Sequence, residues 1–84
     1  MKTHELKCWP APFAAMLKGV KVHEVRRDDG RGFAVGDALL LREYDAPTRE
    51  YTGRQTARFV TYISKGPDWG LPEGLVVMSL REIS

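Results

Sequence analysis

The sequence predicts a small α+β domain in which five or six short strands curl into a β-barrel, with one helix near the N-terminus. The chain has 84 residues, enough for one domain with a single modest core. Short runs of β-branched and aromatic residues alternate with polar residues, and turns rich in glycine and proline separate the runs. Helical spacing of apolar residues follows one proline-rich stretch, residues 10–12. We therefore expect a single domain over residues 1–84.

The first two predicted elements are a strand and a short helix. Residues 4–8 alternate between polar and apolar side chains, with Leu6 and Cys8 on one face, which predicts a strand. Pro10 opens the helix, because a proline in the first turn loses no hydrogen bond. Gly19 is a helix stop. The expected buried stripe of the helix follows i, i+3, i+4 spacing: Phe13, Met16 and Leu17.

Four further stretches read as strands. They are residues 19–27, 38–44, 55–63 and 75–80, of which 38–44 is expected to be central because its first half is apolar on both faces. The polar segments between them read as turns or loops, namely residues 28–32, 45–54 and 65–74. This pattern alone does not distinguish between different small barrels.

Composition limits the class of protein. The 13 basic and 11 acidic residues give a net charge of +2, too small to indicate a polyanionic partner without a particular distribution of charge. The longest apolar runs are far too short to span a membrane, and the first residues lack the pattern of a signal peptide. The single cysteine, Cys8, excludes an internal disulfide, and we expect a buried structural thiol in a cytoplasmic protein.

Charged residues are concentrated in the predicted strand 19–27. Alternation places Glu24 and Arg26 on one face of this strand, so they are paired neighbours. His23 and Arg27 fall on the opposite face. Lys21 lies at the entry of the strand, where a bulge or the preceding turn can redirect its side chain, so its direction stays open.

The spacing Gly19-x-Lys21-x-x-Glu24-x-Arg26 resembles the signature of the ASCH domain family, whose fold is PUA-like. Further stretches resemble a small bacterial and phage subfamily of unknown function: His4-Glu5-Leu6-Lys7, Trp9-Pro10, Val35-Gly36-Asp37, Leu41-Arg42-Glu43, Tyr51-Thr52-Gly53-Arg54 and Gly74-Leu75-Val76-Val77. The resemblance covers nearly the whole chain. It implies a PUA-like barrel that binds RNA or a nucleotide in a cleft carrying the signature residues, with hydrolytic activity in some members.

The function we expect first is binding of RNA or a nucleotide. Lys21 and Arg26 can hold a phosphate or a base edge, while Glu24 orients a guanidinium or accepts a proton from a base amino group. Aromatic residues near basic ones suit single-stranded RNA. Trp9 is expected to pack, although its edge can line the cleft, and Trp69 is expected to be a lid over the core or else an exposed platform. The candidate nucleic-acid-binding residues are Lys7, Trp9, Lys21, Glu24, Arg26, Arg27 and Trp69.

Two alternatives stay open. In the first, the protein hydrolyses a modified nucleoside or RNA, with Glu24 as general base, Lys21 as electrostatic stabiliser and His23 as an added acid for a ribonuclease. Some ASCH relatives are acetylcytidine amidohydrolases, but these use a threonine nucleophile at the position of Glu24, so their mechanism does not carry over. In the second alternative, the signature is a solvated ion pair on an exposed strand face of a structural module.

Cofactors and metals are not expected. Two histidines, one cysteine and the acidic residues show no metal-ligand spacing. The sequence leaves open the identity of the ligand and the oligomeric state.

Overall fold

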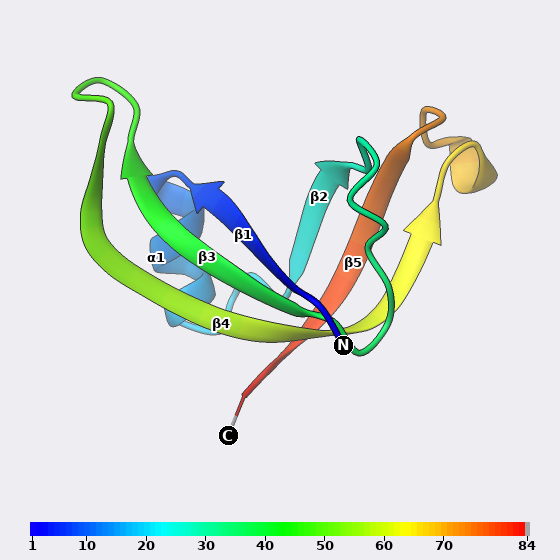
Figure 1. Ribbon diagram of the computed structural model, residues 1–84, viewed down its shortest axis with the longest axis horizontal. Helices are drawn as coiled ribbons and strands as arrows, with labels where there is room; N and C mark the ends of the chain where they lie inside the picture. The colour runs from blue at the N-terminus through cyan, green and yellow to red at the C-terminus, as the bar shows by residue number, and fades with distance from the viewer. Residues whose placement is uncertain (84) are drawn as a thin grey trace.

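Five strands form one sheet that curls into a half-barrel, and a single short helix lies at one end of it (Figure 1). This computed structural model describes residues 1–83. The elements in chain order are β1 (Thr3–Cys8), α1 (Pro10–Leu17), β2 (His23–Arg27), β3 (Ala38–Asp45), β4 (Glu50–Lys65), the 3₁₀ turn η1 (Asp68–Gly70) and β5 (Leu75–Glu82). The chain is therefore a small α+β domain, as the sequence predicts.

The sheet has the strand order β1-β3-β4-β5-β2, so β1 and β2 are its two edges. β1 pairs with β3 in parallel, and the other three pairings are antiparallel. β4 is 16 residues long and bends through both halves of the sheet (Figure 1). The registers shift between Arg42 and Tyr44 and between Val60 and Tyr62, and such irregularities increase bending. The bend lets the two edge strands approach each other.

The apolar core lies inside this curl. β1 presents alternate buried residues, and α1 contributes Phe13 and Met16. Leu17 was expected to be buried with them but is exposed, because an eight-residue helix covers only a small part of the core. The cluster consists of Leu6, Cys8, Phe13, Met16, Phe33, Leu39, Leu41, Val60, Val76, Met78 and Leu80. Within residues 1–83, no helix is both long enough and apolar enough to cross a membrane.

The predicted strand 19–27 is shorter than expected, because only His23–Arg27 is a strand. Gly19 has φ +77°, a left-handed conformation that ends α1. The amides of Val20 and Lys21 then both donate to the carbonyl oxygen of Ala15. These bonds fold the chain back against the end of the helix before β2 begins.

The hairpin between β3 and β4 also differs from the prediction. The connection expected over residues 45–54 is only 46–49, and Tyr44 already pairs with Tyr51. Gly53 reads as a turn residue in the sequence, but it lies inside β4 with φ +93°. The paired strands consequently extend well beyond the core.

A buried polar pair fixes the start of β1. His4 Nε2 lies 2.8 Å from Asp37 Oδ2, and the backbone amide of Lys2 donates to Oδ1. Because an ionised carboxylate only accepts hydrogen bonds, His4 is the donor. These bonds, with that of His4 foremost, hold the pKa of Asp37 below its ordinary value. The His4 ring also packs on Phe33 at 4.6 Å, which ties the loop before β3 to β1.

Candidate functional site

A cleft of about 280 Å³ lies where the end of β1 and the start of α1 meet β2. Its lining residues are Cys8, Trp9, Pro12, Lys21, His23, Glu24, Val25 and Arg26. Three of the four signature residues therefore meet in one cavity. The cleft joins residues 8–12 with residues 21–26, and the curl of the sheet brings these two segments together.

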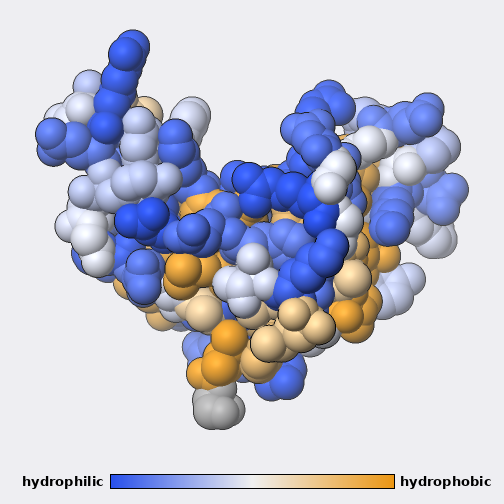
Figure 2. All heavy atoms as spheres, in the orientation of Figure 1, coloured by the Kyte–Doolittle hydropathy of each residue, from blue (hydrophilic) through white to orange (hydrophobic). Residues whose placement is uncertain are grey.

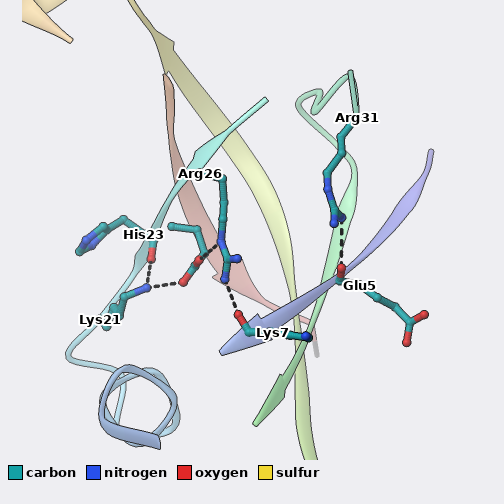
Figure 3. Close-up of polar contacts among 7 residues, drawn as sticks. Glu5, Lys7, Lys21, His23, Arg26 and Arg31 are labelled. Carbon is teal, nitrogen blue, oxygen red and sulfur yellow. Dashed lines mark hydrogen bonds and ion pairs between the residues drawn. The ribbon is translucent and has the colours of Figure 1, made fainter. Parts of the chain in front are cut away.

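Glu24 is the centre of the cleft. Only 4% of this residue is exposed, yet both carboxylate oxygens have cationic partners. Lys21 Nζ contacts Oε1, and Arg26 Nε donates a 2.9 Å hydrogen bond to Oε2 (Figure 3). A buried carboxylate needs such partners to stay ionised. The predicted pairing of Glu24 with Arg26 is confirmed, and the alternative of a solvated ion pair is wrong, because the carboxylate is buried.

Lys21 reaches the carboxylate from the loop that precedes β2. Its ammonium group also donates a 2.6 Å hydrogen bond to the carbonyl oxygen of His23. The turn at Gly19 therefore redirects the side chain toward Glu24, which resolves the direction that alternation left open. Two fixed acceptors hold a side chain that would otherwise be flexible.

Arg26 extends across the open side of the half-barrel. Its Nη2 donates a 2.6 Å hydrogen bond to the carbonyl oxygen of Lys7, on the opposite edge strand (Figure 3). Arg31, in the turn after β2, makes a similar bond of 3.1 Å to the carbonyl oxygen of Glu5. Arg31 was not among the binding residues predicted from the sequence. Its position between Gly30 and Gly32 in a charged turn was the only available signal.

The two tryptophans differ from the expectation. Trp9 is 63% exposed and forms part of the cleft wall instead of packing in the core. Trp69 is 84% exposed in η1 and does not line the cleft, so the expected lid over the core is wrong. A three-residue turn on a loop offers no apolar surface that could cover so large a ring.

Of the remaining predicted residues, His23 lines the cleft, whereas Arg27 and Lys7 do not. His23 accepts the Lys21 hydrogen bond through its backbone carbonyl, while its ring points away from Glu24, as alternation predicts (Figure 3). Arg27 is exposed and does not contribute to the lining. The Lys7 ammonium lies 4.4 Å from the centre of the Tyr44 ring, so Lys7 reaches the site through its backbone carbonyl.

Cys8 lies at the buried side of the cleft, as a buried structural thiol should. Burial is the first cause that raises the pKa of the Cys8 thiol, and the negative charge of Glu24 adds to it. A thiol with a raised pKa is protonated near neutral pH and is a poor nucleophile. Across residues 1–83, no three His, Cys, Asp or Glu side chains gather in a way that could hold a metal ion.

The cleft can therefore donate hydrogen bonds but has little capacity to accept them. Lys21 donates two of its three N–H groups to Glu24 and the carbonyl oxygen of His23, which leaves one N–H group free for a ligand. Arg26 donates two of its five N–H groups to Glu24 and the carbonyl oxygen of Lys7, which leaves three N–H groups free for a ligand. The two cations and one carboxylate leave one net positive charge. This arrangement suits an anion.

The fold and the cleft together define a small α+β half-barrel domain with an ion-paired cleft between its edge strands. The family model described as "Domain of unknown function (DUF3850)" matches residues 3–80, and the chain belongs to that family. No curated protein matches the chain.

Proposed function

We propose that this protein is a PUA-like domain of the ASCH kind that binds RNA or a nucleotide, with a phosphate on Lys21 and Arg26 and a base against Trp9. The observation that carries the proposal is the pair of cations fixed around a buried carboxylate, with N–H groups left over at a cleft. Charge-assisted hydrogen bonds from such groups to phosphate oxygens are strong.

Preorganisation supports binding of an anion. Lys21 and Arg26 each hold two acceptors within the chain, so little side-chain freedom is lost when a phosphate arrives. Glu24 holds both cations in place and leaves a net positive charge at the cleft. Its role in the proposal is to position these two groups.

The size and wall of the cleft support a nucleotide unit. A volume of about 280 Å³ lies just below the range for small-ligand sites, roughly 300–1,000 Å³. Trp9 presents an exposed ring at the wall, and bases of every sequence stack on aromatic rings for about 1–3 kcal/mol each. Phosphate contacts and stacking together fit RNA of no particular sequence.

The hydrolase alternative fits the geometry less well. A general base needs a lone pair directed at the attacking water. Both oxygens of Glu24 already accept hydrogen bonds from cations, and the residue is buried. Only 4% of Glu24 is exposed, so an attacking water has little access to the lone pairs that its carboxylate oxygens retain. We therefore favour binding over turnover.

The experiment that tests the proposal uses the two exposed tryptophans as a matched pair. In Trp69→Phe, Trp9 is the single tryptophan, and titration with uridine monophosphate or a single-stranded oligoribonucleotide should saturably quench its fluorescence. In Trp9→Ala, Trp69 should not respond, and the affinity measured by calorimetry should fall about tenfold. Equal quenching of both, or no binding by calorimetry, would overturn the proposal. Products in the same mixtures, analysed by chromatography, would favour the hydrolase.

A further inference from the structure

We infer that the ligand is a single-stranded polynucleotide that runs along the edge of β1, with one phosphate on Arg26 and the next on Arg31. This inference rests on the proposed function and narrows it, because it requires a second phosphate site outside the cleft. The observation behind it is that two arginines reach the same free strand edge from the same side of the gap (Figure 3).

Arg31 has the capacity for a second ligand group. It donates one of its five N–H groups to the carbonyl oxygen of Glu5, which leaves four N–H groups for a ligand. Its side chain is exposed, unlike that of Glu24. The turn that carries it is ordered by a 2.9 Å hydrogen bond from the amide of Gly32 to Asp28 Oδ1. One hydrogen bond thus fixes the position of Arg31, and its remaining N–H groups are available to a ligand.

The spacing of the two arginines suits consecutive phosphates. Their acceptors, the carbonyls of Glu5 and Lys7, are two residues apart on β1. Two residues of a strand span roughly 6.6–6.8 Å. This resembles the separation of neighbouring phosphates in an extended single strand. The bases of a single strand are free to stack on an aromatic ring such as Trp9, whereas those of a duplex are already stacked and paired, so we infer a single-stranded ligand.

The shape of the molecule leaves room for such a ligand. Figure 2 shows a hollow between the β3–β4 hairpin, on the left, and the turn that follows β2, on the right. Hydrophilic residues line most of this hollow. A polynucleotide can therefore enter this hollow without disturbing the core.

The charges near this edge leave a small net positive charge. The cationic residues there are Lys7, Lys21, Arg26, Arg31 and Arg42. The acidic residues are Glu5, Glu24, Asp28 and Asp29, so five cations and four acids leave one positive charge. Glu24 is buried between its two cationic partners, and Glu5 pairs with Arg42 at 3.6 Å. The free N–H groups of Arg26 and Arg31 are therefore the donors for phosphate at this edge.

A simpler role for the arginines is to cover the free edge of β1, since an uncovered edge invites association with other strands. That role explains one hydrogen bond from each arginine. It predicts no dependence of affinity on ligand length and no change in salt dependence. The dependence of affinity on ligand length and on salt therefore distinguishes phosphate binding from coverage of the edge.

The test compares uridine monophosphate with the dinucleotide pUpU, which adds one phosphate and one base. Affinities are measured by calorimetry at several salt concentrations for the natural chain, Arg31→Gln and Arg31→Lys. The control is Arg49→Gln, because Arg49 is an exposed arginine of the hairpin turn with no side-chain hydrogen bond or ion pair within residues 1–83. Thermal melts show whether each variant is folded.

We expect pUpU to bind about tenfold more tightly than the monophosphate. Arg31→Gln should remove that gain, leave the monophosphate within about twofold, and reduce the slope of log affinity against log salt by about 0.7. Arg31→Lys should restore the slope, and Arg49→Gln should change nothing. Equal affinity for both ligands, or an equal loss of both in Arg31→Gln, would overturn the inference while the cleft proposal stands. Binding of neither ligand would overturn both.

Discussion

Arg26 Nη2 donates a 2.6 Å hydrogen bond to the carbonyl oxygen of Lys7, which joins the two edge strands of the half-barrel through one side chain. The Nε of the same guanidinium donates to Glu24. Closure of the sheet and order in the cleft therefore depend on one residue. Substitutions at Arg26 should affect stability and binding together.

Arg26→Gln should lower the free energy of unfolding by about 1–3 kcal/mol, because it removes a hydrogen bond across the gap and one partner of a buried carboxylate. The matched control is Arg27→Gln, the next residue on β2, whose exposed side chain should matter by less than about 0.5 kcal/mol. Urea unfolding of both variants gives the comparison. Equal stability of the two would mean that the Arg26 bonds contribute nothing.

Glu24→Gln should lower the free energy of unfolding by about 1–3 kcal/mol, since a glutamine amide has one acceptor oxygen where the carboxylate has two. Affinity for a phosphate ligand should hold, because the added net positive charge of the cleft offsets the weaker positioning of Lys21 and Arg26. Calorimetry on the folded variant measures this. A large loss of affinity in a stably folded variant would instead place Glu24 in direct contact with the ligand.

Asp37 should make stability depend on pH in the acidic range. Its pKa lies below the ordinary 3.8, chiefly because His4 donates a hydrogen bond to its carboxylate. A carboxyl group with a lowered pKa stabilises the fold above the ordinary pKa, and this contribution is lost as pH falls through the lower value. Asp37→Asn should be less stable at pH 7 by about 1–3 kcal/mol and should lose less stability below pH 3.8. Urea unfolding of both proteins between pH 2 and 7 measures how stability changes with pH. The same slope of unfolding free energy against pH in the natural chain and in Asp37→Asn would contradict the prediction.

The Cys8 thiol should react slowly with a thiol reagent in the folded protein. Burial first, and the charge of Glu24 second, raise its pKa, so little thiolate is present near neutral pH. We expect the reaction at pH 8 to be at least about tenfold slower than in urea. Reaction at the same rate in both conditions would show that the cleft opens readily to the thiol.

Periodicity predicted most elements of the fold correctly. The alternation in residues 4–8 and the proline at the start of α1 have local physical causes, so the sequence reveals them. The order of the strands and the curl of the sheet depend on contacts between distant residues. Gly53 shows the limit, because the sequence signal of a turn residue is the same as that of an irregular position inside a long strand.

The site was predictable only where side chains contact near neighbours. Strict alternation placed Glu24 beside Arg26, and both lie at the cleft. The second partner of Arg26 is a backbone carbonyl on another strand, and a carbonyl has no signature in sequence. Exposure of Trp9 and Trp69 depends on which surface the curled sheet leaves uncovered, so neither position could be predicted from composition.

The most direct test of the cleft as an anion site compares Arg26→Gln with Arg27→Gln. Each removes one positive charge from adjacent positions of β2, but only Arg26 lines the cleft. Affinity for a single-stranded oligoribonucleotide is measured at one salt concentration, at a temperature where melts show both variants folded. We predict a loss of at least about tenfold for Arg26→Gln and less than about twofold for Arg27→Gln. Equal losses would mean that overall charge alone attracts the RNA, and that the cleft is not the binding site.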